Sequence, residues 1–158
     1  DPFVRELIED FDGSLDDGSR KMLKEVGVWM RRNGEGIYGS HAWKVPGEGE
    51  MVNGKLKQLP GGGLRKHHAD FKFSPQDFRF TVGKNGALYA YCLTVPAPGA
   101  ELKIKSLGTD AKYLDQPIKS VKLLGHDGAL QWKQEAAGLV ITCPAEMPFA
   151  TAVAFRIE

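Results

Sequence analysis

Two adjacent histidines, His67 and His68, are the side chains that most directly suggest chemistry, because imidazole is a common metal ligand. Neighbouring side chains of a strand point to opposite faces, so the pair cannot easily share one ion. His68 and Asp70 could share a face, but a metal centre needs further ligands from elsewhere in the chain. A polar edge strand is the favoured interpretation, and we expect no metal site and no cofactor.

Carboxylates could act as a general acid and base, and they stand together at Asp16 and Asp17 and alone at Glu35. The two aspartates are better interpreted as the start of a helix, where acidic groups suit the positive end of the helix dipole. Glu35 is better interpreted as a carboxylate at a helix end that binds nearby backbone. We therefore assign no residue of this chain to catalysis.

Aromatic side chains could bind carbohydrate, since the apolar face of a pyranose stacks on a Trp or Tyr ring. The candidate carbohydrate contacts are Tyr38, His41, Trp43 and Trp132, and Tyr113 is a further aromatic candidate. A structural role is the favoured alternative. In that interpretation Trp29 and Trp132 pack in the core or against a helix, and Tyr38 and Trp43 fix a junction between helix and sheet.

Two cysteines, Cys92 and Cys143, stand in apolar runs typical of strands. They are too few for a disulfide scaffold, and their spacing fits no zinc motif. Buried free thiols are the favoured interpretation, and a bridge between neighbouring strands stays open.

The composition is that of a soluble globular domain, with 42% hydrophobic and 26% charged residues in 158. The formal net charge of +1 gives no reason to expect a nucleic acid as partner. No apolar run approaches the length of a membrane span, and the first residues show no signal peptide, so we expect a cytoplasmic or an already processed chain.

Two helices are predicted at the start of the chain. The first follows Asp1 and Pro2, with apolar residues at helical spacing: Phe3, Val4, Leu7, Ile8 and Phe11. The second begins near Ser14, Asp16 or Asp17, and Asn33-Gly34 supplies a left-handed stop. Its apolar residues form one stripe that should face a core: Met22, Leu23, Val26, Trp29 and Met30.

After Trp43 the pattern changes, first to Pro- and Gly-rich loops between short strands and then to recurrent β-rich runs. The predicted strands cover residues 70–73, 78–82, 87–95, 101–106, 118–124, 130–133, 139–143 and 150–157. Hairpin turns are predicted at residues 84–86 and 126–128, where Asn-Gly and Asp-Gly supply positive φ angles. The predicted fold class is mainly β: an antiparallel Greek-key β-sandwich preceded by two α-helices.

The segment WMRRNGEGIYGSHAW, residues 29–43, closely resembles a segment of the α-L-fucosidases of glycoside hydrolase family 29. In that family it closes the last helix of the catalytic (β/α) barrel and leads into a C-terminal β-sandwich. Further matches follow in the family's order at residues 77–81, 88–90, 104–108, 118–125, 138–142 and 144–146. The resemblance implies a helical segment over 1–42 that belongs to the end of the barrel, and a sandwich domain over 43–158.

The chain departs from the family in two places. In this sequence Phe11 is followed directly by Asp12 and Gly13, whereas the family has an apolar barrel strand between the helix and the Asp-Gly turn. The catalytic strands, which supply an aspartate nucleophile and a carboxylate acid/base in this family of retaining glycosidases, have no counterpart in this sequence. The resemblance therefore leaves open whether the chain is itself an enzyme, and it suggests an extracytoplasmic location.

Three functions are compatible with this sequence. The first is the non-catalytic C-terminal portion of an α-L-fucosidase, whose partner is the catalytic barrel of the same or a neighbouring subunit. The second is a stand-alone carbohydrate-binding module with a fucosylated glycan as ligand. The third is an interaction domain whose helices dock a partner chain. No nucleic acid or membrane partner is expected for any of them.

Overall fold

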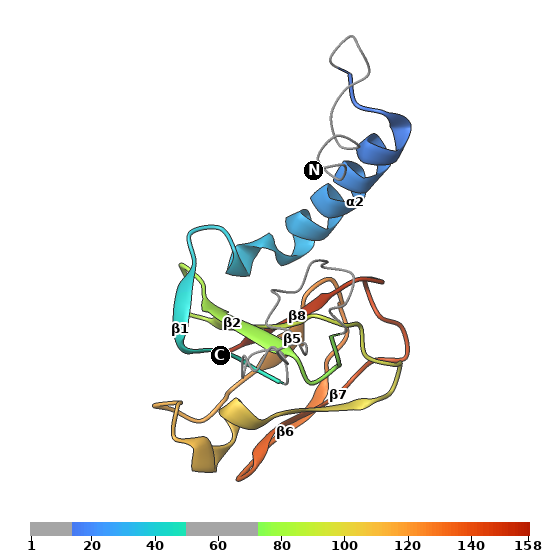
Figure 1. Ribbon diagram of the computed structural model, residues 1–158. Coiled ribbons are helices and arrows are strands. Elements are labelled where there is room, and N and C mark those ends of the chain that lie inside the picture. Colours follow the sequence, from blue (N-terminus) through green and yellow to red (C-terminus); the bar gives the residue numbers. More distant parts are fainter. Residues whose placement is uncertain (1–13, 50–72) are drawn as a thin grey trace, which may run out of the picture.

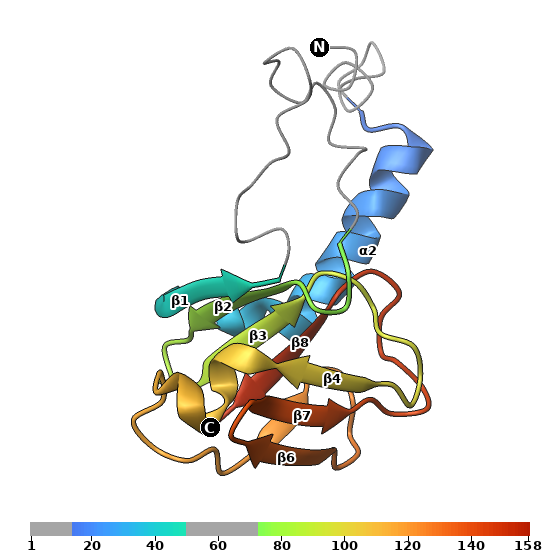
Figure 2. The same cartoon turned by 60° about the horizontal axis from the view of Figure 1, so that its bottom comes forward.

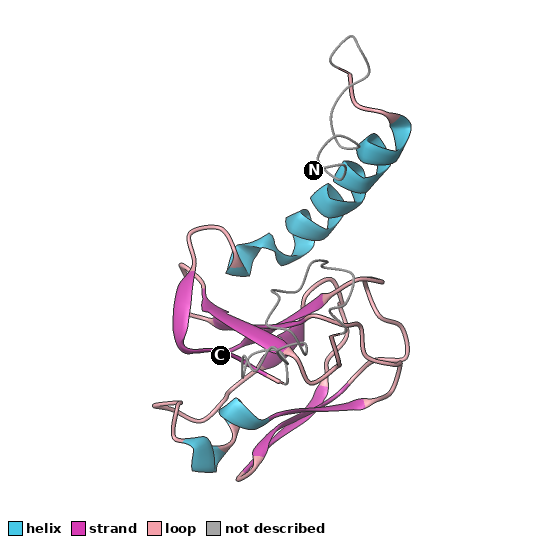
Figure 3. Ribbon diagram, viewed as in Figure 1, coloured by secondary structure: helices cyan, strands magenta, loops and turns pink. Residues whose placement is uncertain are grey.

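The computed structural model describes residues 14–49 and 73–158, and it consists of one long helix standing on two antiparallel sheets (Figure 1). Strands dominate the part next to the C-terminus, while the helix is the only long helical element in the described residues (Figure 3). The predicted mainly β sandwich is confirmed. The predicted helix over residues 1–11, the strand at 70–73 and the histidine pair fall wholly or largely outside the described residues.

Helix α2 spans Asp17–Asn33, as the periodicity predicts. Asp16 is its N-cap: one carboxylate oxygen accepts from the Ser19 amide at 2.9 Å and the other from the Ser19 hydroxyl at 2.6 Å. These bonds satisfy donors that the first turn of a helix otherwise leaves free. Arg31 and Arg32 stand in the last turn, where positive charge suits the helix dipole.

The predicted left-handed stop at Gly34 is wrong, because Gly34 has φ −70° and ψ −14°. The chain instead continues into a short 3₁₀ helix, η1 (Gly34–Gly36). Glycine is needed here for space: a Cβ on Gly34 would lie 2.6 Å from the Tyr38 ring. The first left-handed residue after α2 is Gly39, at φ 64°, just before strand β1 (His41–Glu48).

The larger sheet has the strand order β1-β2-β3-β8-β5, all antiparallel. Its strands are β1 (His41–Glu48), β2 (Phe78–Val82), β3 (Leu88–Cys92), β8 (Val153–Ile157) and β5 (Val121–Leu123). The β2–β3 turn is the predicted hairpin at residues 84–86, with Gly86 at φ 78°.

The smaller sheet, drawn in front of the larger one in Figure 2, has the order β4-β7-β6. Its strands are β4 (Glu101–Ile104), β7 (Gly138–Thr142) and β6 (Gln131–Glu135). The chain crosses between the sheets after β3, β4, β5 and β7. Two further 3₁₀ turns, η3 (Lys105–Leu107) and η4 (Thr109–Ala111), follow β4. The predicted strand 101–106 therefore ends two residues early.

The inward faces of the two sheets form one hydrophobic core. Phe78 and Phe80 of β2 face Leu102 and Ile104 of β4 and Ile141 of β7 across it, each at most 3% exposed. Cys92 and Cys143 belong to this core and are free, which confirms the interpretation of buried thiols.

Two features differ from the prediction. Strand β1 includes residues 44–48, which the sequence assigned to loops, because an edge strand tolerates Pro46 where its register shifts between Ala42 and Gly47. Residues 126–128 are not a hairpin, since β5 and β6 lie in different sheets. The hairpin of the smaller sheet instead joins β6 to β7, with Glu135 opposite Gly138.

Candidate functional site

The junction between α2 and the larger sheet is formed at the C-terminal end of the helix. The Trp29 indole Nε1 donates to the Ala152 carbonyl at 2.8 Å, and its ring lies 6.1 Å from that of Tyr91. The Tyr91 hydroxyl donates to the Asn33 carbonyl at 3.0 Å. Glycine at position 36 lets the chain pass over β3, where an added Cβ would lie 2.4 Å from the Tyr89 ring. These contacts fix one end of the helix on the outer face of the sheet.

Polar contacts complete this junction. The Thr81 hydroxyl donates to the Gly36 carbonyl at 2.6 Å, and the Arg156 guanidinium lies 3.8 Å from the Glu35 carboxylate. Burial raises the pKa of the Tyr89 and Tyr91 hydroxyls, so both remain protonated and able to donate at neutral pH. Glu35 therefore forms an ion pair between the helix end and the sheet, at an arginine that also bonds to Glu158.

The sequence of strand β3 contains a pattern that indicates this junction. All five of its residues, Leu88–Cys92, are buried, although a strand with one solvated face alternates between buried and exposed. The run LYAYC is apolar or aromatic throughout, which is typical of a strand covered on both faces. The sequence therefore indicated that something covers the outer face of β3, and the structure places Trp29 and η1 there.

Beyond the junction, α2 stands clear of the sandwich (Figure 1). The stripe predicted to face a core is covered only at Trp29 and Met30, which are half-buried. Its other three members are exposed: Met22 at 44%, Leu23 at 52% and Val26 at 52%. Val28 is also 49% exposed, and it lies about 200° around the helix axis from Val26. The described residues thus leave apolar side chains of α2 uncovered on two sides.

The four candidate carbohydrate contacts occupy different parts of the structure. Tyr38 is 64% exposed and packs over Gly34, and His41 is exposed at the start of β1. Trp43 is half-buried, edge-to-face with Phe80 at 5.3 Å between ring centroids. These residues belong to the junction or to the larger sheet, whereas Trp132 lies in β6 of the smaller sheet. The fold does not gather the four residues around one site.

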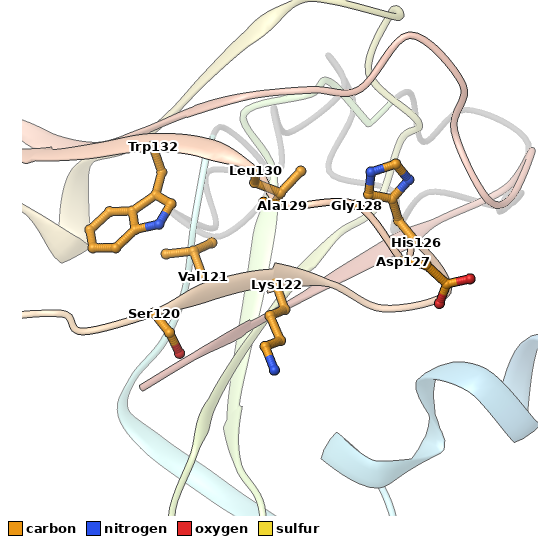
Figure 4. Close-up of a pocket in the computed structure, with 9 residues that line it drawn as sticks. All are labelled: Ser120, Val121, Lys122, His126, Asp127, Gly128, Ala129, Leu130 and Trp132. Atoms are coloured by element: carbon orange, nitrogen blue, oxygen red, sulfur yellow. The ribbon is translucent and has the colours of Figure 1, made fainter.

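Trp132 lines a cavity of about 530 Å³ at the seam between the edge strands β5 and β6. Figure 4 shows Trp132 and Val121 toward one end of this cavity and His126 and Asp127 toward the other. The ring of Trp132 also packs against the core, opposite Ile141 of β7. One end of the cavity is therefore apolar and continuous with the core, and the other end, at His126 and Asp127, forms its polar mouth.

Comparison with known families gives one match: the family described as alpha-L-fucosidase C-terminal domain, over residues 73–158. This match covers more than half of the chain and runs from just before β2 to the end of β8. The chain belongs to this family. No curated protein sequence matches it.

In this fucosidase C-terminal domain, the carboxylate of Asp16 and the thiol of Cys92 both occupy structural positions. Asp16, the carboxylate with the clearest local role, caps α2, and bonds from the Ser19 hydroxyl and amide lower its pKa. Burial raises the pKa of Cys92 to about 11, so its thiol is not a nucleophile at neutral pH.

The described part of this fucosidase domain also holds no group of three His, Cys, Asp or Glu residues placed to bind a metal ion. His67, His68 and Asp70 lie outside the described residues. No helix in the described ranges has the length and hydropathy to cross a membrane.

Proposed function

We propose that this chain is the non-catalytic C-terminal portion of an α-L-fucosidase, and that it supports the catalytic barrel through α2. The match to the family makes it the C-terminal part of such an enzyme. The observation that carries the supporting role is the state of α2: one end is fixed to the sandwich, and the rest exposes apolar residues on two sides. Large exposed apolar side chains grouped on one helix normally mark a surface that packs against another body.

The chemistry of the parent enzyme agrees with a non-catalytic, supporting role for this chain. Retaining hydrolysis of a terminal α-L-fucoside needs two carboxyl groups about 5–5.5 Å apart across the scissile bond, on a rigid scaffold. Two carboxylates in the described residues have structural roles: Asp16 caps α2, and Glu35 forms an ion pair with Arg156. We propose that residues 1–42 belong to the end of the barrel, residues 43–158 form the sandwich domain, and the two catalytic carboxylates come from the barrel.

Binding to a separately expressed barrel of a retaining α-L-fucosidase tests this function. We expect a complex in calorimetry, weakened at least tenfold by Val28→Asp, because the charge would enter an apolar interface. Lys133→Ala, on β6 of the smaller sheet and away from α2, is the control and should change the affinity little. Absence of binding, or turnover of an aryl α-L-fucoside by the 158-residue chain alone, would contradict the proposal.

Carbohydrate binding is a second candidate, and the cavity beside Trp132 is the observation that favours it. A glycan array with fucosylated ligands tests it directly. Because Trp132 also packs against the core, the informative variants are His126→Ala and Asp127→Ala at the polar mouth, with Lys133→Ala on β6 as control. Loss of a signal in the first two variants alone supports this function, and silence across the array counts against it.

A further inference from the structure

The apolar end of the cavity between β5 and β6 is a fixed wall. Val121 is 5% exposed, and its side chain points toward the ring of Trp132 (Figure 4). Leu130, two residues before Trp132 in the chain, lines the cavity as well. All three side chains also pack with the core between the sheets, which holds them in place. A ligand would therefore meet a preformed apolar surface at this end.

The polar mouth is formed by the turn that follows β5. The His126 amide donates to the Leu123 carbonyl at 3.2 Å, and Gly125 adopts φ 83° in this turn. The imidazole lies over Gly128, where an added Cβ would come within 2.5 Å of its Nε2. Asp127 is exposed next to it. The turn therefore places two hydrogen-bonding side chains at the mouth: a neutral imidazole both donates and accepts, and a carboxylate accepts.

The lining does not have the charge of an ion-binding site. Figure 4 shows the side chains of Lys122 and Ser120 on the side of β5 away from Trp132. The Ser120 hydroxyl donates to the Glu158 carboxylate at 3.1 Å on that side. Between β5 and β6, the apolar wall faces an imidazole and a single carboxylate. Such a lining fits a neutral ligand that has both an apolar part and hydroxyl groups.

The edge of β5 adds main-chain groups beside the cavity. Ser120 and Glu158 exchange two main-chain hydrogen bonds, both of 3.1 Å. In an antiparallel ladder, the amide and carbonyl of the next residue, Val121, therefore turn away from the partner strand. Within the described residues, β8 is the only strand that pairs with β5. Val121 thus presents a donor and an acceptor at the open edge, next to the cavity that it lines.

We propose that this cavity binds a terminal 6-deoxyhexose, the sugar class of L-fucose, with its methyl group against Val121 and Trp132 and its hydroxyl groups at the mouth. The proposal rests on carbohydrate binding, the second candidate function, and names its ligand. A pyranose has an apolar face that stacks on an aromatic ring. A 6-deoxyhexose also carries a methyl group where an ordinary hexose has a hydroxymethyl group, and only the methyl group enters the apolar end without burying an unbonded hydroxyl.

The size of the cavity separates it from a second hollow beside Trp132. The cavity measures about 530 Å³, within the range of about 300–1,000 Å³ that is usual for ligand sites. The depression on the outer face of the smaller sheet measures about 220 Å³. Two of its lining residues, Lys133 and Glu135, form an ion pair at 3.2 Å and so bind each other. The cavity between β5 and β6 is therefore the better ligand site of the two.

NMR titration of the 158-residue chain with methyl α-L-fucoside and methyl α-L-galactoside tests the ligand. The two glycosides differ only in the methyl group of the first, which is a hydroxymethyl group in the second. We expect the fucoside to bind at least tenfold more tightly, because its galactoside analogue brings a hydroxyl to an apolar wall. The indole N–H signal of Trp132 and the amide signals of His126 and Asp127 should shift during the titration.

Val121→Thr tests the position of the methyl group. Threonine is close to valine in shape and brings a hydroxyl to the apolar end of the cavity. We expect the preference for the fucoside over the galactoside to fall at least threefold. Val140→Thr makes the same change on the outer face of the smaller sheet and should leave the preference unchanged. Equal preferences in the two variants would overturn this placement of the methyl group.

The outcomes of the titration distinguish this proposal from the functions on which it builds. Equal affinity for the two glycosides would overturn the assignment to a deoxy sugar and leave carbohydrate binding standing. Shifts confined to residues outside the cavity would overturn the site. Absence of shifts with either glycoside would overturn the carbohydrate function as well. Support of the barrel by α2 is tested separately, by the binding measurement on Val28→Asp.

Discussion

Gly36 lies where the end of η1 passes over two tyrosines of β3, with no room for a side chain. A Cβ there would come within 2.4 Å of both the Tyr89 ring and the Tyr91 hydroxyl. We expect Gly36→Ala to lower the free energy of unfolding by about 1–3 kcal/mol, the usual cost of overpacking. Urea unfolding followed by circular dichroism measures the change.

Gly27→Ala is the matched control for this prediction. Gly27 lies inside α2, and the nearest atom to an added Cβ is the end of the Arg31 side chain at 3.5 Å. Alanine is a better helix former than glycine by about 1 kcal/mol, so this variant should be as stable as the parent or more stable. A Gly36→Ala protein as stable as Gly27→Ala would contradict the packing at the junction.

Asp16 gives α2 a dependence on pH. Bonds from the Ser19 hydroxyl and amide to its carboxylate lower its pKa below the ordinary value of 3.8. A lowered pKa in the folded state means that the cap stabilises the helix above pH 3.8 and is lost as the pH falls through the lowered value. We expect a larger loss of helical signal on acidification in the parent than in Asp16→Asn, because asparagine caps without titrating. Identical acid titrations of the two proteins would contradict this role.

Cys92 and Cys143 should be unreactive in the folded protein. Burial raises the pKa of both thiols, that of Cys92 to about 11, and the thiolate is the form that reacts. At pH 8 we expect neither thiol to react with a disulfide reagent within minutes, and both to react in guanidinium chloride. Rapid labelling of either cysteine without denaturant would show that the core opens at that position.

At the level of the helix, Trp29 is the side chain that fixes α2 to the sheet. Trp29→Phe keeps an aromatic ring but removes the indole donor to the Ala152 carbonyl. We expect the free energy of unfolding to fall by about 0.5–1.5 kcal/mol, the net value of one hydrogen bond. Lys24→Gln, on an exposed turn of the same helix, should stay within about 0.5 kcal/mol of the parent. Equal stability of both variants would indicate that the indole bond is not needed.

The elements of this chain were predictable to the extent that local patterns determine them. The stripe from Met22 to Met30 predicts α2, and the alternation of Phe78, Phe80 and Val82 predicts β2. Strand β1 was missed because Pro46 and Gly47 break the local pattern, while pairing with β2 maintains the strand. The turn at residues 126–128 was misassigned because an Asp-Gly pair indicates a turn but not which sheet the next strand joins.

The junction was harder to predict because distant residues form it. Structural roles for Trp29 and Tyr38 were expected from the sequence, but nothing local relates Trp29 to Ala152 or Tyr91 to Asn33. The same limit holds for Glu48, whose carboxylate accepts from the Lys105 and Ser106 amides at 2.8 and 2.7 Å. Such contacts depend on how the sheets stack, which periodicity in one strand does not determine.

In the whole molecule, the two sheets differ in how their outer faces are used. The larger sheet has its outer face buried at Tyr89, Tyr91 and Ala154, where α2 and η1 lie. The smaller sheet turns Lys133, Val140 and Thr142 outward, where they line a shallow surface depression. Attachment to a larger body is therefore expected on the side of the larger sheet.

A variant that begins at Ser40, without α2 and η1, tests this asymmetry. Removing both elements would expose Tyr89 and Ala154, both 0% exposed in the full chain, while the core between the sheets keeps its own residues. We expect the variant to retain its strand signal in circular dichroism, to melt at a lower temperature and to bind a hydrophobic dye. Lys133→Glu, on the outer face of the smaller sheet, should leave melting and dye binding unchanged. If the shortened chain melted like the full one and bound no dye, the outer face of β3 would not depend on α2, and the helix could not transmit support from a barrel to the sandwich.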